Sequence, residues 1–332
     1  MTRLVLAGTG VIGWRHMDHI QAHPDLTLAG IIEPENQPVG IEAPVFKDID
    51  DVDVEADGIV IASPTDTHTY LAIRAAERGW HALVEKPIAD SLGNADRIIS
   101  AADASGTQIL VGHHRRHHPR TAVLKNLIDT ERVGRPVVAS LMWTMKKPDD
   151  YFDPDWRKTA EGAPVRMNLI HEIDLLRWYF GEVTDVCGFG SNAQRGAART
   201  ESGGVVVAFS SGVHVTIAFA DTTPTPWGFE AGSGENPYIA ETGQDCLRIA
   251  CTEGGIEFPS LRVWSGADNW QEAPTSEVVP VDQGVPLVCQ LEHFADVIHG
   301  RADPLISARD GRATLAATLL IEDATLPEGV RG

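Results

Sequence analysis

The feature that most constrains this chain is a short apolar segment followed at once by three spaced glycines. Residues 3–7 read as a buried strand. The glycines that follow it, directly before a segment with helical character, are Gly8, Gly10 and Gly13, in the spacing G-x-G-x-x-G. Such a strand–turn–helix unit presents main-chain N–H groups to phosphates at a helix N-terminus. The pattern predicts a dinucleotide-binding unit; a glycine-rich turn without a ligand is the alternative.

Glu33 supports the dinucleotide interpretation and bears on the choice of cofactor. It lies 20 residues beyond Gly13, at the end of the next apolar segment, where a carboxylate can accept hydrogen bonds from a ribose. The same carboxylate would repel the 2′-phosphate of NADP, and no Arg or Lys follows it before Lys47. We therefore expect NAD in preference to NADP. The alternative for Glu33 is a solvated carboxylate at the end of a strand.

Apolar and helical segments alternate through the first third of the chain. The predicted strands are 3–7, 26–32, 58–62, 81–84 and 108–112, with helices up to about residue 22, over 68–79 and over 91–105. Later, β-branched and partly alternating segments at 136–145, 203–210 and 212–219 predict an antiparallel sheet, with helices over 168–180, 287–299 and 308–323. We expect an α/β domain over 1–119 and an α+β domain over 120–332, which binds substrate and mediates oligomer formation, with a Thr-, Pro- and Gly-rich loop over 221–237. Packing of the C-terminal helix back on the first domain is the alternative for that helix.

Composition excludes several classes of protein. The chain has 27 basic and 47 acidic residues, a net charge of −20, which disfavours nucleic acid as a partner. No apolar run approaches the ~18–20 residues of a membrane span, and the apolar stretch 4–7 is too short for a signal peptide. The cysteines are scattered without a C-x-x-C pair, at Cys187, Cys246, Cys251 and Cys289. We expect a cytoplasmic protein with reduced cysteines and without a membrane partner.

Two motifs beyond the glycine turn make the chain similar to a known family. The first is Ser63-Pro64-Thr65, with His68 three residues later, and the second is Glu85-Lys86-Pro87. With the glycine turn, residues 58–87 resemble the Gfo/Idh/MocA family, named for glucose–fructose oxidoreductase and inositol dehydrogenase. The resemblance continues through 111–119, 155–157, 162–183 and 291–311. It implies a Rossmann domain followed by a C-terminal domain with a large open sheet, which in relatives commonly mediates oligomer formation. A homodimer or homotetramer is therefore expected.

The resemblance also implies a set of cofactor-binding residues. Its members are Gly8, Gly10, Val11, Ile12, Gly13, Glu33, Ser63, Pro64, Thr65, His68, Glu85, Lys86, His114, Trp156 and Arg157. Among these, His114 corresponds to a position beside the nicotinamide. Arg157 is a candidate for a phosphate contact, and its alternative is a solvent-facing Arg beside a packed Trp.

Lys86 and His171 are the candidate catalytic residues. Lys86 ends a predicted strand at the carboxyl edge of the parallel sheet, where ligands of doubly wound folds bind. Partial desolvation beside a cationic nicotinamide would lower its pKa, which suits proton transfer; a surface lysine is the alternative. His171 lies in an apolar helical segment, where the pattern alone favours a core histidine. The resemblance instead implies a general acid or base acting on the substrate hydroxyl.

The segment before His171 departs from the family pattern. Many sugar dehydrogenases of the family carry an Asp four residues before this His, whereas this chain has Met167, followed by Asn168. Either Lys86 and His171 suffice, with Asn168 binding substrate, or the chemistry differs from simple polyol oxidation.

Two further segments hold candidate ligands. Histidines at 113, 114, 117 and 118 have the spacing of a zinc site on a helix, but Arg115 and Arg116 between them disfavour a cation, so we expect no metal. The loop 224–237 is long and Gly-rich and carries Trp227 and Glu230 as candidate substrate contacts. A merely structural loop is the alternative.

These observations predict an NAD(P)-dependent oxidoreductase. A hydride would pass between nicotinamide and a secondary alcohol or carbonyl, by resemblance that of a sugar, cyclic polyol or derivative. One alternative is a non-redox protein that holds the dinucleotide tightly, as a glycosidase acting by transient oxidation or as a ligand sensor. Another is an imine, enone or diol-type reductase, which Met167 in place of the acid favours.

Overall fold

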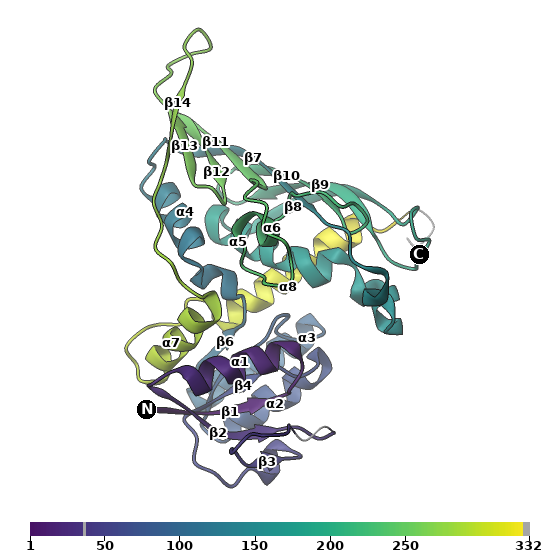
Figure 1. Ribbon diagram of the computed structural model, residues 1–332, viewed down its shortest axis with the longest axis vertical. Coiled ribbons are helices and arrows are strands. Elements are labelled where there is room, and N and C mark those ends of the chain that lie inside the picture. The colour runs from purple at the N-terminus through teal and green to yellow at the C-terminus, as the bar shows by residue number, and fades with distance from the viewer. Residues whose placement is uncertain (36–37, 328–332) are drawn as a thin grey trace. The chain divides into compact units, whose positions relative to one another are not determined.

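The computed structural model describes residues 1–35 and 38–327 and divides the chain into two units (Figure 1). Unit 1 comprises Met1–His118 and Gly284–Ala316, and unit 2 comprises Pro119–Gln283 and the chain from Ala317 onward. The first boundary lies one residue from the expected 119/120 division. The segment Gly284–Ala316 groups with the N-terminal unit, whereas the sequence placed it in the C-terminal domain.

Unit 1 is built on a six-stranded parallel sheet in the order β3-β2-β1-β4-β5-β6. The strands are β1 Thr2–Ala7, β2 Leu26–Ile32, β3 Val45–Phe46, β4 Gly58–Ile61, β5 His81–Val84 and β6 Ile109–Val111. The central strands are almost continuously buried, as expected when helices cover both faces of a parallel sheet. This order is that of a doubly wound nucleotide-binding domain, which places the carboxyl ends of β1 and β4 at the point where the strand order reverses.

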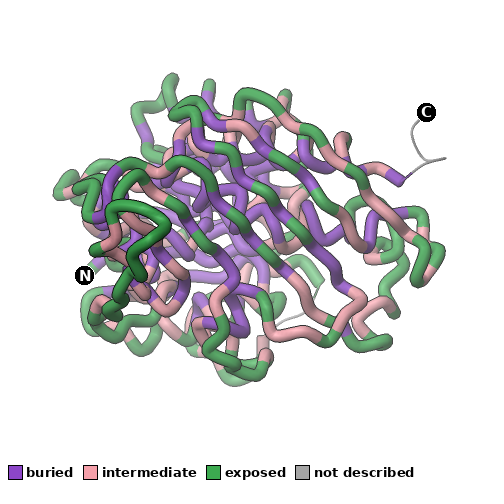
Figure 2. The backbone as a smooth tube through the Cα atoms, turned by 90° about the horizontal axis from the view of Figure 1, so that it is seen from above, coloured by how far each residue is buried: buried purple, intermediate pink, exposed green. Residues whose placement is uncertain are grey.

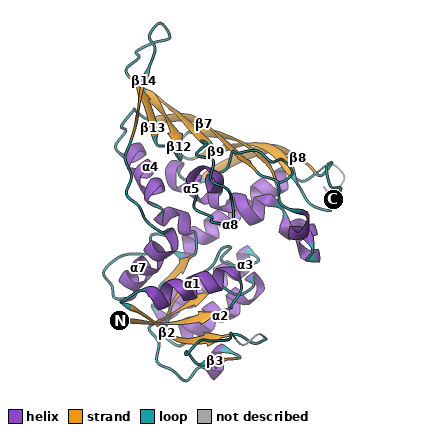
Figure 3. Ribbon diagram, viewed as in Figure 1, coloured by secondary structure: helices purple, strands orange, loops and turns teal. Residues whose placement is uncertain are grey.

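Four helices of unit 1 bury apolar residues. They are α1 Val11–Ala22, α2 Thr65–Glu77, α3 Leu92–Ser105 and α7 Pro286–Ile298. Buried apolar residues of α1 and α7 belong to one core with the sheet, and Figure 3 shows these helices beside the strands. In α1 the buried positions Gly13, His16, Met17 and Ile20 recur at helical spacing. Leu291 and Phe294 of α7 belong to the same core as Leu4 and Leu6 of β1, so the late segment completes the N-terminal unit.

Unit 2 contains an eight-stranded, mostly antiparallel sheet in the order β14-β13-β12-β11-β7-β10-β9-β8. The strands are β7 Pro136–Thr144, β8 Val183–Ser191, β9 Ser202–Phe209, β10 His214–Ala220, β11 Leu247–Cys251, β12 Gly254–Phe258, β13 Arg262–Ser265 and β14 Thr275–Val278. Within the described residues, β7 and β10 run parallel and every other neighbouring pair runs antiparallel. The predicted fold class is thus confirmed.

One face of this sheet carries the core of unit 2, and exposed residues alternate with buried ones along β7 and β10 (Figure 2). The helices are α4 Pro119–Asp129, α5 Ile170–Phe180, α6 Phe229–Ser233 and α8 Ala308–Ala324, and α8 runs from unit 1 into unit 2. Phe180 of α5 packs edge-on against Phe209 of β9, with ring centroids 5.8 Å apart. The apolar side of the sheet is therefore closed by helices.

The structure corrects the predictions for unit 2 in three places. The segment 221–237 is not wholly loop, since it contains α6 at Phe229–Ser233. The helix predicted over 168–180 begins at Ile170, because a π-helical turn at Val165–Leu169 precedes it. Strands β8 and β11 to β14 were not predicted; β14, for example, is exposed at all four residues and has no apolar periodicity.

The described ranges contain no helix that is both long enough and apolar enough to span a membrane.

We expect Leu83→Ala to lower the free energy of unfolding by about 2–5 kcal/mol. Leu83 on β5 has no exposed surface, so the truncation leaves a cavity in a close-packed sheet. Urea denaturation measures the change. Ser100→Ala, at an exposed position of α3, is the control and should stay within about 0.5 kcal/mol of the wild type. Equal stability of the two variants would contradict the assigned core.

Candidate functional site

The glycine turn after β1 is held by close contacts between main-chain atoms. Gly8 has φ +92°, and a Cβ there would lie 2.7 Å from the main-chain nitrogen of Ser63. A Cβ at Gly13 would lie 2.2 Å from the carbonyl oxygen of Gly8. A Cβ at Gly10, by contrast, would meet nothing within 4 Å. Packing inside the chain therefore explains Gly8 and Gly13, whereas the space beside Gly10 is open.

The start of α1 has the features of a phosphate-binding helix end. Gly10 is the N-cap, and its missing side chain leaves the first main-chain N–H groups without a side-chain cap. Val11 in the first turn is 76% exposed, although it is apolar. Uncapped N–H groups at a helix N-terminus attract anions. Gly10, Val11 and Ile12 are thus placed where a pyrophosphate could accept these N–H groups.

Glu33 lies against the glycine turn. Its Oε2 accepts hydrogen bonds from the main-chain N–H of Thr9, at 3.0 Å, and from the Thr9 hydroxyl, at 2.6 Å. The side chain is half-buried. Glu33 therefore stabilises the turn itself, in addition to presenting a carboxylate where a ribose would be expected.

The Ser63-Pro64-Thr65 segment connects β4 to α2 beside Gly8. Its backbone is the surface against which Gly8 packs, and α2 begins at Thr65 after Pro64. The Ser63 hydroxyl lies 2.6 Å from that of Thr67. The strand ends of β1 and β4 are thus joined directly at the edge of the sheet where ligands of this fold class bind.

His68 joins two loops of this edge. The ring is 1% exposed, and its two nitrogens each lie 3.0 Å from a main-chain carbonyl oxygen, Nε2 from Ser63 and Nδ1 from Pro87. Burial holds the pKa of His68 below its usual value, and the two carbonyl oxygens act in the opposite direction. A neutral ring donates its single N–H to one of these oxygens and only contacts the other. Through these contacts His68 connects the loop after β4 to the loop that carries Lys86.

Lys86 follows β5 and is half-buried, and its main chain is fixed by Glu85. The Glu85 side chain is 6% exposed; its Oε2 accepts the Lys86 main-chain N–H at 3.3 Å, and its Oε1 lies 2.8 Å from His16 Nε2. A Cβ at Gly112 would come within 3.0 Å of the Glu85 carboxylate, so the end of β6 closes over it. The carboxylate predicted to contact the cofactor is therefore engaged by the protein itself.

The charge of Glu85 is stabilised by its neighbours. Burial pushes its pKa up, but the hydrogen bond from His16 and the charges of His16, His114 and Lys86 outweigh burial, so the pKa of Glu85 is lowered. His16 was not among the residues predicted from the sequence. The available signal was its position in α1, three residues after Gly13 on the buried face.

The histidines after β6 lie in a 3₁₀ turn. His113 and His118 are buried, His114 is half-buried, and the His117 ring lies 5.1 Å from that of His293. Among the residues that the structure describes, no three His, Cys, Asp or Glu side chains come together as a possible metal site.

In unit 2, His171 lies in the first turn of α5 and is 8% exposed. The π-helical turn before it, Val165–Leu169, holds Met167 and Asn168. The Oδ1 atom of Asn168 is buried without a hydrogen-bond partner among the described residues. A π-helical turn and an unsatisfied buried oxygen are both common at functional sites.

Trp156 and Arg157 lie in a short 3₁₀ helix, Asp155–Lys158, of unit 2. Trp156 is 43% exposed. The Arg157 guanidinium lies 4.2 Å from the centre of the Tyr151 ring and donates to the Tyr151 carbonyl oxygen at 2.7 Å. Arg157 is thus stacked on an aromatic ring, which differs from a simple solvent-facing arginine.

The two candidates of the 224–237 segment have different surroundings. Trp227 is 39% exposed, and its carbonyl oxygen accepts the Thr144 main-chain N–H at 2.7 Å. Glu230 on α6 is 5% exposed and accepts the indole N–H of Trp143 at 3.2 Å. Trp227 therefore remains available to a ligand, whereas the Glu230 carboxylate is directed into unit 2.

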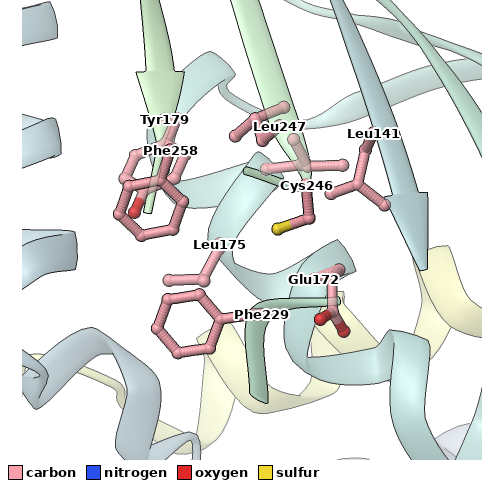
Figure 4. A pocket seen from close by; sticks show the side chains of 9 residues that line it. Leu141, Glu172, Leu175, Tyr179, Phe229, Cys246, Leu247 and Phe258 are labelled. Atoms are coloured by element: carbon pink, nitrogen blue, oxygen red, sulfur yellow. The ribbon is translucent and has the colours of Figure 1, made fainter. Parts of the chain in front are cut away.

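A small cavity of about 10 Å³ lies under the sheet of unit 2 (Figure 4). The surface that faces the cavity is apolar, with Phe229 and Phe258 stacked 5.3 Å apart, and Glu172 and Cys246 are among the residues that line it. This volume has room for about one water molecule and excludes a sugar.

Both units match family models that occur together. Residues 2–113 match the model described as "Oxidoreductase family, NAD-binding Rossmann fold". Residues 121–257 match the "GFO/IDH/MocA C-terminal domain". Together the two matches cover well over half of the chain.

Individual proteins show the same relationship at low identity. The chain is 25% identical over 277 residues to the 1,5-anhydro-D-fructose reductase of Ensifer adhaerens, covering 82% of this chain and 78% of that protein. It is 28% identical to inositol 2-dehydrogenase 4 of Saccharopolyspora erythraea, over 65% of each chain. Matches to further curated relatives span between 36% and 66% of those proteins.

A solved structure shares the fold at still lower identity. The WlbA dehydrogenase of Bordetella pertussis, solved with NADH and UDP-GlcNAcA, superposes with a TM-score of 0.75 at 22% identity. The alignment covers 97% of this chain and 96% of that one.

We expect the stability of the wild type to fall more steeply between pH 6 and pH 4 than that of Glu85→Gln. The folded-state pKa of Glu85 is lowered, so its ionised form contributes stability above the unfolded-state pKa, and this is lost as pH falls toward the folded-state value. Urea denaturation at several pH values measures the slope. Asp53→Asn, at an exposed position, should keep the wild-type slope. Parallel curves for wild type and Glu85→Gln would show that the Glu85 charge is not stabilised by folding.

Proposed function

Because the chain belongs to the Gfo/Idh/MocA family of oxidoreductases, we propose that it interconverts a secondary alcohol and a carbonyl on a sugar or cyclic polyol, with NAD as the hydride carrier. The observation that supports the proposal most directly is how the loops are connected at the carboxyl ends of the parallel strands of unit 1. There the glycine turn, the Ser63 loop and the Lys86 loop are bound to one another by His68 and by main-chain contacts. The reductase and dehydrogenase names of the relatives support the substrate class.

The residues of unit 1 fit a dinucleotide. Gly10 leaves its backbone open to a ligand, the first N–H groups of α1 lack side-chain caps, and Glu33 lies beside the turn. We infer that α1 binds the pyrophosphate and that Glu33 binds the adenosine ribose. The dinucleotide, when bound, supplies a nicotinamide ring that accepts or donates the hydride. Glu33 favours NAD because its negative charge would lie close to the 2′-phosphate of NADP.

Lys86 is proposed to orient the substrate and to assist the movement of its hydroxyl proton. Its ammonium group has three N–H donors, and its backbone is fixed on one side by Glu85 and on the other by the contact of His68 with Pro87. A fixed backbone removes main-chain freedom that substrate binding would otherwise have to restrict. Glu85 and His68 are therefore proposed to position Lys86, and not to contact the nicotinamide.

His171 is proposed to act as general acid or base toward the substrate hydroxyl. Its neutral ring can take up the hydroxyl proton as a C–H bond is oxidised and return it in the reverse direction. Met167 has no proton to exchange, so this chain lacks the acid of many relatives at that position. Asn168, with its unsatisfied Oδ1, is proposed to accept a hydrogen bond from a substrate hydroxyl.

We also propose a cytoplasmic homodimer or homotetramer that associates through the sheet of unit 2. The cysteines are all free thiols, as in a reducing compartment. The sheet face opposite the core carries partly exposed apolar side chains, among them Val138, Met142 and Val206. A second copy would remove this apolar surface from water.

We expect the wild type to have a lower KM for NAD than for NADP, and Glu33→Ser to narrow that difference. Loss of the carboxylate removes the repulsion of a 2′-phosphate and also a hydrogen-bond partner of the NAD ribose. Steady-state kinetics with both cofactors measures the change. Glu35→Ser, two residues on and exposed, should keep the wild-type preference. Equal use of both cofactors by the wild type would contradict the assignment of Glu33.

We expect Lys86→Ala and His171→Ala each to lower kcat/KM by roughly 10²–10⁴-fold and to affect NAD affinity much less. If both residues serve one proton transfer, the double variant should be little worse than the poorer single variant. Initial rates of NADH formation with a panel of polyols and sugars, with NAD binding followed by fluorescence, test this. Lys125→Ala and His23→Ala are matched controls that should retain wild-type rates. Near-normal rates in both Lys86→Ala and His171→Ala would refute the pair.

A further inference from the structure

Charged side chains gather where β7 and β10 of unit 2 end. These strands are parallel neighbours, so their carboxyl ends lie at the same edge of the sheet. Lys147 follows β7 and Asp221 follows β10, and the Lys147 main-chain N–H donates to the Asp221 carbonyl oxygen at 3.2 Å. Lys147 was not among the residues predicted from the sequence. Lys147 lies just beyond the end of β7.

The carboxylate closest to Lys147 is already engaged by two arginines. Asp221 has no exposed surface; its Oδ1 accepts from Arg195 at 2.6 Å and its Oδ2 from Arg199 at 2.7 Å. The Lys147 Nζ lies 3.9 Å from Oδ2, which is beyond hydrogen-bond distance. Lys147 therefore receives electrostatic attraction from Asp221 but no hydrogen bond.

Two other carboxylates near this group also have donors of their own. Both oxygens of Glu201 accept the main-chain N–H of Arg195, at 2.8 and 3.0 Å. Glu230 accepts the indole N–H of Trp143. The acceptors around Lys147 are thus directed to other donors.

The Lys147 ammonium is buried without a hydrogen-bond acceptor in the part of the chain that the structure describes. The side chain is 5% exposed, and Nζ lies 4.5 Å from the centre of the Tyr151 ring. Burial lowers the pKa of Lys147 to about 8; Arg199 and Arg195 act in the same direction, and Asp221 and Glu230 oppose them. Burying a cation whose three N–H donors have no acceptor is unfavourable for the free energy of folding. A role in binding a ligand explains why such a group is present.

Thr223 provides a second, independent observation on the same face. An isolated antiparallel bridge pairs Lys146 with Thr222, with the Lys147 main-chain N–H bonded to Asp221 on one side of it and the Thr223 main-chain N–H bonded to Met145 on the other. Residues that flank a paired position share one side of the two chains, which places Thr223 on the same side as Lys147. The Thr223 Oγ1 is buried and, in the described ranges, has no hydrogen-bond partner. Two unsatisfied polar groups, one of them cationic, therefore face the helix-covered side at this edge.

We propose that Lys147 is the anchor of a subsite in unit 2 that binds a carboxylate group of the substrate, with the Thr223 hydroxyl as a second donor. The proposal rests on the proposed function, since the carboxylate belongs to a sugar acid or similar polyol acid. Two donors suit the two oxygens of a carboxylate better than the three of a phosphate. Binding exchanges the contact of Lys147 with the Tyr151 ring for a charge-assisted hydrogen bond.

Tyr151 is the residue that must move to admit the ligand. It lies in the 3₁₀ turn Asp149–Phe152, in which no residue is buried, and its displacement exchanges the ring contacts with Arg157 and Lys147 for solvent. Tyr151→Ala should therefore leave the subsite intact and more open.

Calorimetry on the protein saturated with NAD tests the subsite with three probes: D-glucuronate, D-glucose 6-phosphate and D-glucose. We expect the wild type to bind glucuronate more tightly than the other two. Lys147→Met, which keeps the length of the aliphatic chain, should weaken glucuronate binding roughly 10–100-fold and change glucose binding less than about threefold. Lys146→Met, on the exposed neighbouring residue, is the matched control and should bind as the wild type does. Tyr151→Ala should bind glucuronate at least as tightly as the wild type.

Proton uptake gives a readout that a merely structural lysine would not change. A bound carboxylate favours the charged form of Lys147, so near pH 8 the wild type should take up about half a proton per glucuronate. Titration in two buffers of different ionisation enthalpy measures this number. Lys147→Met should take up almost none, and Lys147→Gln carries the same expectation if the Met variant does not fold.

The outcomes separate this proposal from the proposed function. The subsite proposal would be overturned if the Lys147 variants kept the glucuronate affinity and the proton uptake of the wild type. It would also be overturned if the wild type bound glucose as tightly as glucuronate, or did not bind glucuronate. Tighter binding of glucose 6-phosphate would overturn the choice of carboxylate. Lys147-dependent binding without NADH formation from any polyol, sugar or sugar acid would instead support the subsite and contradict the oxidoreductase reaction.

Discussion

At the carboxyl edge of the parallel sheet in unit 1, the structure is determined by how closely three main-chain segments approach one another. The carbonyl oxygen of Gly8 lies 2.2 Å from where a Cβ of residue 13 would be, and the backbone of Ser63 lies 2.7 Å from where a Cβ of residue 8 would be. These distances leave no room for side chains, so helix α1 and the loop after β4 are brought directly against the turn. Gly10 belongs to the same turn but is free of such contacts, and it is therefore the residue of the three that a ligand can use.

Buried polar side chains extend this rigidity to Lys86. His68 bridges the loops after β4 and β5 through two carbonyl oxygens, and Glu85 connects the Lys86 peptide to His16 in α1. The helix proposed to bind the pyrophosphate is thereby connected to the loop that carries the proposed proton-transfer lysine. Pre-organisation of this kind reduces what substrate binding must supply to align the reacting groups.

Strong local patterns made much of unit 1 predictable, and their absence limited the prediction of unit 2. The buried strands and the glycine spacing predicted a doubly wound unit, because most of these strands have a glycine or proline within a few residues of their ends. The two-residue strand β3 was not predicted, since it is too short for a pattern. Strand β14 is exposed at every residue and α6 has five residues, so neither has a periodicity to detect. His16 and Lys147 acquire their surroundings from residues 69 and 74 positions away, Glu85 and Asp221, and such contacts leave no local signal.

The return of α7 to the core of unit 1 has a consequence for biosynthesis. Unit 2 is inserted into unit 1, since the chain passes from unit 1 to unit 2 at His118 and returns at Gly284. Leu291 and Phe294 share a core with Leu4 and Leu6, so the first strand to leave the ribosome lacks part of its packing until almost 300 residues have been made. Unit 2, whose eight strands come from one continuous stretch, has its whole sheet available earlier. The core of unit 2 also waits, because Ala317 and Ile321 of α8 belong to it. Both cores are therefore completed only near the end of translation, although each sheet is encoded earlier.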